Sequence, residues 1–532
     1  MTLSRLDRTS LLWPCLAVAA LVILPFIGIQ NLPLSDHPNH VARYYILDAY
    51  ATSPALQSLY VIREGFQPYW TLRGFMLLFG PILGVESAGH AFAAFALTLP
   101  ALATVWLHRQ VAGGSSLPAI MVVLVLFSGV AGWGFMNFIA TLGIALGVFT
   151  LWIRFEPLAD VKKLVPFALL ALAVCTMHMI MAFILGLMIG FWELSRVVQR
   201  RRVERTDVVR FVTIGLVFLP ALALLLLQSA DAFGDTATAW GYWSHRGEAM
   251  MSLFDFVGSE DWPVNLHLLL VLGAVVALVV YGNLLRKRGI IASGASPVRI
   301  DRHLAFTAAA ILIVGLALPF NVSGVAYLNI RFPLVSALLF IGAIRVDLPR
   351  FGAALGGVFA LLLLAKSAMV HAQFRAFDAD IRELRAAAEI LPRGSKVFLA
   401  LDESASTGRS FSQRPGFVHY NHQLSPLIIE RDILSPYLFT MFEVGVRPEH
   451  ERYTAPHDFA QEADSLRKGS EFRKYARKWR EDFDYVVLAH LGTPTAAPIA
   501  GTERVHQGEW FQILKVLPDS HPSLGSPVVA FD

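Results

Sequence analysis

The densest cluster of polar residues that could do chemistry lies at residues 33–45, where the chain reads Pro-Leu-Ser-Asp-His-Pro-Asn-His-Val-Ala-Arg-Tyr-Tyr. Pro38 suits the first turn of a helix, so Asp36 falls at or just before the amino terminus of a helix that runs to about Tyr50. A carboxylate held at a rigid helix start can act as a general base toward a hydroxyl or as a ligand of a divalent metal ion. The alternative is that Ser35 or Asp36 only caps the helix.

Two histidines and an arginine follow this carboxylate. His40 and Arg43 would share one face of the expected helix because they are three residues apart. His37 and His40 are candidates for lining a site, and His40 could join Asp36 as a ligand of Mg²⁺ or Mn²⁺. Arg43 is a candidate for binding a phosphate group. The alternative for both histidines is a place among the ordinary polar residues of a membrane interface.

The composition places this cluster in a membrane protein. The chain has 532 residues, of which 55% are hydrophobic and 16% charged, whereas soluble domains carry about 25% charged residues. The net charge is only +4, and the basic residues form short clusters beside apolar segments, so no nucleic-acid partner is expected. Cys15 and Cys175 both lie inside apolar segments and have neither disulfide nor metal-ligand spacing.

Apolar runs long enough to cross about 30 Å of hydrocarbon recur along most of the chain. They predict a polytopic all-α membrane protein with about eleven transmembrane helices and membrane lipids around them. The predicted spans are residues 11–29, 88–107, 117–132, 135–153, 164–177, 179–194, 209–228, 265–282, 303–320, 327–345 and 352–370. A further apolar segment, 73–84, is only about 12 residues long and contains Gly80 and Pro81, which suits a re-entrant or interfacial helix.

Basic clusters set the orientation of these spans. Residues 196–205, 286–288 and 345–350 carry the strongest clusters, and the positive-inside rule places all three in the cytoplasm together with the basic amino terminus. The chain then ends outside the cytoplasm. Two outer loops are expected at 30–84 and 229–264.

The character of the sequence changes after residue 371. Residues 372–532 mix charged residues with short strand-like runs, and an amphipathic pattern over 459–480 predicts a helix. The strand-like runs are 396–401, 485–489 and 510–516. About 160 residues can form a core of their own. The sequence therefore predicts a membrane domain at 1–371 and a soluble α/β domain at 372–532 on the outer face.

Several other candidates fall on the outer face in this topology. Arg331 lies at the mouth of the tenth span and Lys366 near the end of the last one, and both could bind a phosphate. The alternative for Arg331 is a snorkelling side chain. Asn137 and His178 lie in outer turns and could line a shared site. The second outer loop adds aromatic residues that could stack on a sugar or form an interfacial belt, and acidic residues that could act as a second carboxylate: Trp240, Tyr242, Trp243, Asp255, Glu260 and Asp261.

In this arrangement the chain resembles the GT-C superfamily of integral-membrane glycosyltransferases. The resemblance lies in a first span followed at once by a large outer loop with an acidic residue near its start, many spans and an outer soluble domain. Asp36 matches the essential acidic position, but His37 stands where the family often has a second acid. Residues 67–70, Gln-Pro-Tyr-Trp, are similar to a stretch of some aminoarabinose and mannosyl transferases.

The resemblance implies an enzyme with a polyprenyl-phosphate-linked sugar as donor. The acceptor would be a lipid, a glycan or a protein, and the reaction would take place on the periplasmic face of a bacterial inner membrane. No Walker loop, G-x-S-x-G elbow or H-E-x-x-H motif is present in the sequence, which weighs against an ATPase pump, a hydrolase of that fold and a zinc protease. A transporter, flippase or polymer-handling protein is the alternative, and a sensor with an outer ligand-binding domain is a third.

Overall fold

The structure is a computed structural model of the whole chain, and it divides into two compact units. Unit 1 contains Met1–Gln30 and Gln67–Arg375, and unit 2 contains Asn31–Phe66 and Ala376–Asp532. The description below covers all residues except 1–7, 64–68, 114, 157–159, 233–243, 255–263, 291–297, 320–326, 348–351, 403–421, 423, 441–442, 455–460, 463–477, 491–498 and 518–532.

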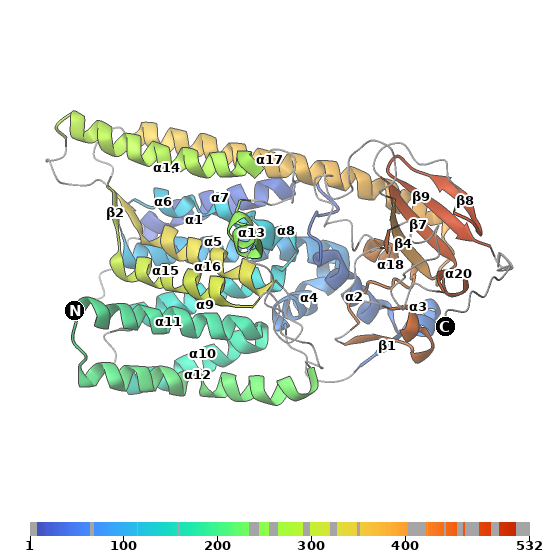
Figure 1. The fold of residues 1–532 in the computed structure, drawn as a ribbon, viewed down its shortest axis with the longest axis horizontal. Coiled ribbons are helices and arrows are strands. Elements are labelled where there is room, and N and C mark those ends of the chain that lie inside the picture. Colours follow the sequence, from blue (N-terminus) through green and yellow to red (C-terminus); the bar gives the residue numbers. More distant parts are fainter. Residues whose placement is uncertain are drawn as a thin grey trace, which may run out of the picture. The chain divides into compact units, whose positions relative to one another are not determined.

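Unit 1 is built from helices, most of which run roughly parallel or antiparallel to one another (Figure 1). Strands β2 (Val298–Ile300) and β3 (Ile344–Val346) pair antiparallel at one end of it. The helices are α1 (Arg8–Ile23), α4 (Trp70–Leu83), α5 (Val85–Val111), α6 (Leu117–Ile120), α7 (Val123–Leu126), α8 (Gly129–Gly132), α9 (Met136–Arg154), α10 (Asp160–Met177), α11 (Met179–Arg200), α12 (Arg205–Ala232), α13 (Ser244–Met251), α14 (Val264–Lys287), α15 (Arg302–Ala317), α16 (Leu328–Ala343) and the first part of α17 (Gly352–Ala387).

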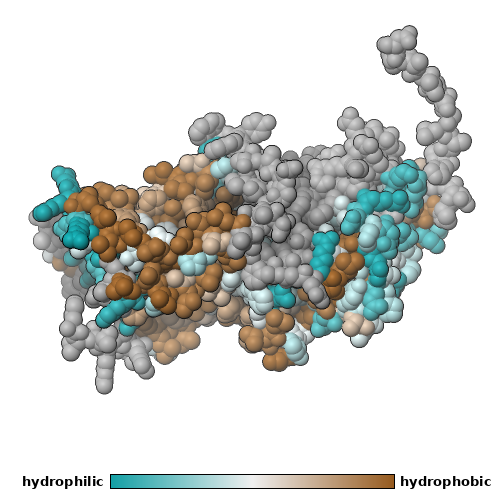
Figure 2. Space-filling view, turned by 90° about the horizontal axis from the view of Figure 1, so that it is seen from below, coloured by the Kyte–Doolittle hydropathy of each residue, from teal (hydrophilic) through white to brown (hydrophobic). Residues whose placement is uncertain are grey.

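The long apolar helices confirm the prediction of a mostly helical, multi-pass membrane protein. Six of the described helices are long and apolar enough to cross a membrane, and five shorter apolar ones accompany them. Much of their surface is apolar, as Figure 2 shows for one face. In the most apolar stretch of α12 and of α14, only 17% and 22% of the residues are buried inside the protein. Such exposure of apolar side chains is expected of helices that face lipid. The number of crossings stays a prediction.

One predicted span, 117–132, is wrong as a continuous helix. The chain forms three short helices there, α6, α7 and α8, and Phe127 between the last two has non-helical dihedral angles of φ −79° and ψ 76°. Gly129 and Gly132 favour helix poorly, so the apolar composition alone does not keep the segment helical. The break is stabilised from outside, because Lys366 Nζ donates a hydrogen bond to the Phe127 carbonyl at 3.1 Å.

The weaker apolar segment at 73–84 forms most of helix α4. With 14 residues, α4 is too short to cross the membrane, as expected from the sequence. Its outer face carries exposed Leu77, Leu78 and Ile82, and Leu72 and Met76 are buried on the other side. Apolar side chains thus lie on both the exposed and the buried side of α4. The interfacial or re-entrant placement stays a prediction.

The described residues of the basic clusters gather at one end of unit 1 (Figure 1). Glu193 in α11 is buried there and accepts hydrogen bonds from Trp152 Nε1 at 2.9 Å and Arg210 Nη1 at 3.1 Å. Arg196 pairs with Glu156, which joins the ends of α9 and α11. Ser195 Oγ lies 2.9 Å from His303 Nδ1, so the start of α15 is at the same end. Helices α9, α11 and α16 therefore all run toward this basic end (Figure 1).

Unit 2 contains a mixed five-stranded sheet in the order β6-β4-β7-β9-β8. Strand β4 pairs parallel with β6 and β7, and β9 pairs antiparallel with β7 and β8. The elements of unit 2 are α2 (His37–Ala49), α3 (Pro54–Leu59), β1 (Tyr60–Ile62), the last part of α17, β4 (Val397–Asp402), α18 (Ser425–Arg431), β5 (Val444–Val446), β6 (Gln461–Glu462), α20 (Trp479–Asp482), β7 (Tyr485–His490), β8 (Thr502–Gln507) and β9 (Phe511–Val516).

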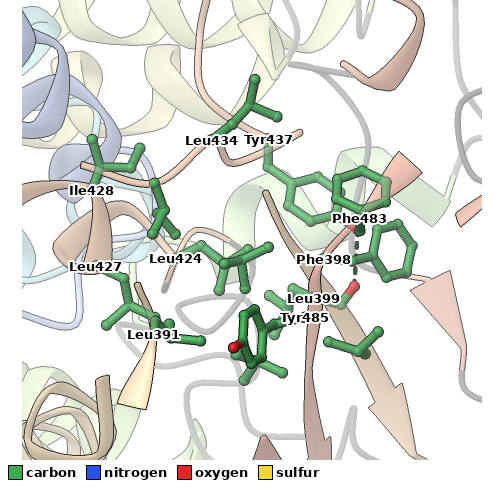
Figure 3. Packing of buried hydrophobic residues seen from close by; sticks show 14 of the residues in the cluster. Leu391, Phe398, Leu399, Leu424, Leu427, Ile428, Leu434, Tyr437, Phe483 and Tyr485 are labelled. Atoms are coloured by element: carbon green, nitrogen blue, oxygen red, sulfur yellow. Dashed lines mark hydrogen bonds between the residues drawn. The ribbon is translucent and has the colours of Figure 1, made fainter. Parts of the chain in front are cut away.

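The core of unit 2 joins two distant parts of the sequence. Ile46 and Leu59 pack in one cluster with side chains of β4, α18 and β7, part of which Figure 3 shows. In that cluster Tyr437 donates a hydrogen bond from its hydroxyl to the carbonyl of Leu399 at 2.9 Å. Strand β1 also pairs with β5, with Tyr60 opposite Val446. The boundary by contacts thus differs from the predicted one at residue 371, because 31–66 fold with the carboxyl-terminal part.

The three strand-like runs of the sequence correspond to β4, β7 and β9, so these predictions are confirmed. The helix predicted over 459–480 is wrong where the structure describes it, because β6 occupies Gln461–Glu462 and α20 begins only at Trp479. The other residues of that range lie outside the described part of the chain. Pairing with β4 takes precedence over the local amphipathic pattern at β6.

Candidate functional site

Asp36 occupies the N-cap position of α2, as the position of Pro38 predicts. Its side chain, however, accepts no hydrogen bond from the described first turn of α2, so the capping alternative does not account for the carboxylate. Instead, Oδ1 lies 3.5 Å from Nε2 of His422, and the Asp36 side chain is 19% exposed against 8% for His422. The positive end of a helix stabilises a negative charge at this position. The carboxylate is therefore partly accessible and faces a buried imidazole.

Asn39, one turn into α2, holds His422 from the other side. Asn39 is fully buried, and its Nδ2 lies 2.9 Å from His422 Nδ1 and donates to the carbonyl of Tyr437 at 2.7 Å. Its Oδ1 accepts a hydrogen bond from the backbone N–H of Phe439 at 2.9 Å. The Phe439 ring lies 5.1 Å from the ring of His422 and 5.3 Å from that of His40. Asp36, His422 and Asn39 thus form a connected series of side chains.

Arg43 and His40 lie on the same helix, as their spacing predicts. Arg43 forms an ion pair with Glu443 at 2.7 Å, and its Nη1 lies 3.2 Å from His40 Nδ1. Burial and then the charge of Arg43 hold the pKa of His40 well below its usual value, so His40 is neutral near pH 7. Because Arg43 is a donor only, His40 Nδ1 accepts and its proton resides on Nε2. His37, the first residue of α2, is buried.

The Arg43–Glu443 pair gives a prediction for stability. Arg43→Ala should lower the free energy of unfolding of unit 2 by about 3–5 kcal/mol, because it leaves Glu443 buried with its main charge partner removed. The two side chains are only 6% and 8% exposed, so water screens the pair weakly. The measurement is a double-mutant cycle from melting temperatures in detergent. Arg43→Ala/Glu443→Ala should melt above Arg43→Ala, and equal melting of the two variants would contradict this account.

The metal site expected at Asp36 and His40 finds little support among the side chains around it. In the described part of the chain no three His, Cys, Asp or Glu side chains gather closely enough to hold a metal ion. His40 Nδ1 is already engaged by Arg43, and Asp36 faces His422. These residues do not fit a metal site by themselves, so the divalent ion stays a prediction and no step is assigned to it below.

Arg331 is a buried cation of unit 1. It lies in the first turn of α16, is 7% exposed, and holds its guanidinium 4.3 Å from the centroid of the Phe135 ring and 5.4 Å from that of Phe138. Both contacts are cation–π interactions. A snorkelling arginine would extend along the surface into water. Arg331 is instead enclosed by aromatic side chains.

His178 and Asn137 lie at the same end of the helices, as the topology predicts. The His178 ring contacts the rings of Tyr69 and Phe138, with centroids 5.0 and 5.6 Å apart, and Arg331 lies within electrostatic range of His178 and Tyr69. Asn137 Oδ1 accepts a hydrogen bond from the Leu72 N–H at 2.9 Å, which ties the start of α9 to α4. The structure therefore brings His178 and Arg331 together. The side-chain amide oxygen of Asn137 instead accepts a structural hydrogen bond between two helices.

Two aromatic residues beside Arg331 have unusual backbones. Tyr69 and Tyr327 precede α4 and α16 with φ of 73° and 55°, in the left-handed region that side chains other than glycine rarely adopt. Such a conformation costs about 1–3 kcal/mol and persists where the surroundings enforce it, often at functional sites. The centroid of the Tyr327 ring lies 4.2 Å from that of Trp133, with the two rings tilted by 33°. We use the term aromatic cage for Tyr69, Trp133, Phe135, Phe138 and Tyr327, the rings around Arg331 and His178.

The aromatic cage lies at the end of unit 1 opposite the basic clusters. Helices α9, α11 and α16 begin beside the cage and end at the ion pairs of Glu193 and Arg196. Lys366, in contrast, is fully buried against the Phe127 carbonyl, where it stabilises the break between α7 and α8. Its predicted contact with a phosphate stays untested. Trp240, Tyr242 and Trp243 and the acids Asp255, Glu260 and Asp261 lie outside the described residues.

Sequence reasoning missed three polar partners of the α2 site. His422 and Glu443 lie about 380 and 400 residues after α2, and neither belongs to a recognisable motif. Asn39 lies inside the polar cluster itself but was not singled out. The signal that could have drawn attention to it is its place one turn after Asp36, on a helix that must bury one face.

Similar proteins are found among solved structures but not among family models or curated sequences. No family model matches the chain, and no curated protein matches it by sequence. The structure is similar to ArnT from Cupriavidus metallidurans bound to undecaprenyl phosphate, with a TM-score of 0.45 and 11% identity over 97% of this chain and 99% of that one. It is also similar to the arabinofuranosyltransferase AftD from mycobacteria, with a TM-score of 0.43 and 15% identity over 97% of this chain and 42% of AftD.

Proposed function

We propose that the protein is a membrane glycosyltransferase that moves a sugar from a polyprenyl-phosphate donor to an acceptor hydroxyl on the periplasmic face of a bacterial inner membrane. The observation that carries the proposal is Asp36, a partly accessible carboxylate at a helix start that is not used as a cap and is held by buried neighbours. A general base needs this combination of access and fixed geometry. The GT-C resemblance of the sequence points to the same residue.

In the proposed reaction Asp36 takes the proton of the acceptor hydroxyl as its oxygen attacks the anomeric carbon of the sugar. The new bond joins the acceptor oxygen to that carbon, and the bond from the carbon to the phosphate oxygen breaks. Its electron pair leaves with the polyprenyl phosphate, which is released as the product. The proton later passes from Asp36 to solvent. A positioned base of this kind contributes about 10²- to 10⁴-fold in rate.

Arg331 is proposed to bind the phosphate of the donor. A phosphate in a mostly apolar setting needs a charged hydrogen-bond donor, because burying an anion without one is costly. The guanidinium of Arg331 lies over the rings of Phe135 and Phe138, and its paired N–H donors match the geometry of a phosphate group. The nature of the donor and of the acceptor and the binding of a phosphate by Lys366 are likewise proposed.

The orientation of the chain gives the second prediction. A reporter fused after residue 532 should be periplasmic, because the basic clusters lie at one end of unit 1 and α17 runs away from that end before the chain enters unit 2. Alkaline phosphatase fused there should be active, and a fluorescent reporter that folds only in the cytoplasm should show no fluorescence. The matched control is a fusion after Arg202, between α11 and α12, where the two reporters should behave in the opposite way. Cytoplasmic fluorescence at residue 532 would contradict the topology.

The proposed function is tested with the purified full chain in detergent. The donors are undecaprenyl phosphates that carry a labelled hexose, pentose or aminopentose, and the acceptor is a total extract of membrane lipids and glycans. With at least one donor, the labelled sugar should appear on an acceptor molecule, and the moles of sugar transferred should exceed the moles of enzyme. Absence of transfer from every donor, by purified protein that is shown to be folded, would count against the proposal.

A further inference from the structure

The side chain of Asn39 has only one orientation that satisfies its neighbours. The Phe439 N–H is a donor, so the atom 2.9 Å from it must be the amide oxygen of Asn39. The Tyr437 carbonyl is an acceptor, so the atom 2.7 Å from it must be the amide nitrogen. Backbone groups on both sides thus settle the amide assignment that hydrogen positions usually leave open.

This orientation fixes where the proton of His422 resides. The Asn39 Nδ2 that faces His422 Nδ1 at 2.9 Å can only donate, so Nδ1 must accept and carries no proton. The proton of the neutral ring is then on Nε2, which is the atom 3.5 Å from Asp36 Oδ1. A second proton on Nδ1 would point at the donor N–H of Asn39. The neutral ring with its proton toward Asp36 is therefore the favoured form.

We propose that His422 is a positioning residue that donates its Nε2–H to Asp36 and thereby holds the carboxylate in the orientation needed for proton abstraction. This inference rests on the proposed function, because it assigns His422 a task for the base that the function requires. In this proposal Oδ1 receives the hydrogen bond from His422, and Oδ2 is the oxygen that acts on the acceptor hydroxyl. The acceptor proton moves to that oxygen.

His422 takes no proton itself in this account. Its Nε2 already carries one, and the lone pair on Nδ1 is occupied by Asn39. This separates the arrangement from a proton relay, in which the imidazole would receive the acceptor proton. The rings of His422 and Phe439 pack edge to face, so the imidazole is also restrained from the side. Another side chain that donates an N–H group to Asp36 from the same position could therefore replace the imidazole, and Asp36 would still act as the base.

Two variants of His422 test this distinction. Glutamine places an N–H donor near the position of Nε2, and so keeps the contact with Asp36 but loses the contact with Asn39. Asparagine places its amide near the position of Nδ1, and so keeps the contact with Asn39 but no longer reaches Asp36. Each variant removes one hydrogen bond and leaves a polar amide, which makes the two changes a matched pair for stability.

The measurement is turnover of a labelled undecaprenyl-phosphate sugar by the full-length protein. His422→Asn should lower kcat about 10- to 100-fold with little change in KM, because a hydrogen bond to a charged group is lost. His422→Gln should remain within about 5-fold of the parent, since a single neutral contact is exchanged. Melting temperatures of the two variants should be similar.

Three outcomes would overturn the inference. Equal losses in His422→Gln and His422→Asn would indicate that the imidazole is a relay or only packs. Near-parental kcat in His422→Asn would show that Asp36 needs no positioning by this residue. An equal rise of KM in both variants would place His422 in substrate binding. These results would leave the proposed function standing, because that function fails only if Asp36 itself is dispensable or no donor is turned over.

Discussion

Asp36→Asn should lower the turnover of a polyprenyl-phosphate sugar by about 10²- to 10⁴-fold, the range expected when a positioned general base is removed. Asparagine keeps the size of the side chain and caps helices about as well as aspartate, so α2 should form normally. The amide can still accept the hydrogen bond from His422, but it cannot take a proton from the acceptor. The measurement is the initial rate of label transfer at saturating donor.

A second acid of the same helix provides the control for this variant. Asp48 is exposed near the end of α2 and belongs to no part of the proposed site. Asp48→Asn makes the same chemical change in the same helix and should leave turnover within about 2-fold, as surface substitutions usually do. If Asp36→Asn stayed near the parental rate, the base would have to be sought elsewhere. The other acids to test are Glu86, in the first turn of α5, and Asp255, Glu260 and Asp261 of the second predicted outer loop.

Arg331→Lys should weaken the use of the donor about 10- to 100-fold in kcat/KM although the positive charge is kept. Lysine offers a point charge without the planar pair of N–H groups that binds a phosphate, and it cannot stack flat on Phe135 and Phe138. The matched control is Arg299→Lys at the basic end of unit 1, where the arginine is 68% exposed beside Asp347. It should leave donor use unchanged.

Binding separates the phosphate role of Arg331 from a structural one. The affinity for undecaprenyl phosphate alone should fall in Arg331→Lys, with the melting temperature of the ligand-free protein close to that of the parent. Equal affinity of Arg331→Ala and the parent protein for undecaprenyl phosphate would leave only a packing role for Arg331 within the aromatic cage.

Local patterns in the sequence predicted most helices and the central strands because these elements depend on nearby residues. The start of α2 follows from Pro38 and Asp36, and β4, β7 and β9 follow from short apolar runs. The break between α7 and α8 could not be predicted in this way. It depends on Lys366, which supplies a hydrogen bond to the Phe127 carbonyl from a helix more than 200 residues later.

The site on α2 shows the same division. The sequence gives the order and the faces of Asp36, His40 and Arg43, because these follow from helical spacing. It does not give His422 or Glu443, because each meets α2 only through the tertiary fold of unit 2. The pairing of β1 with β5, which brings residues 31–66 into unit 2, is equally non-local. A long-range partner without a motif of its own leaves no pattern in one sequence.

The most direct test of the central claim follows the fate of the donor itself. The purified protein is placed in liposomes with an undecaprenyl-phosphate sugar labelled differently in its sugar and its lipid, together with the acceptor extract. A transferase separates the two labels, so one undecaprenyl phosphate should be released for every sugar transferred. Asp36→Asn should lower both signals together by about 10²- to 10⁴-fold. Movement of the intact donor across the bilayer with both labels still joined, at the same rate in Asp36→Asn, would contradict the account and identify a flippase.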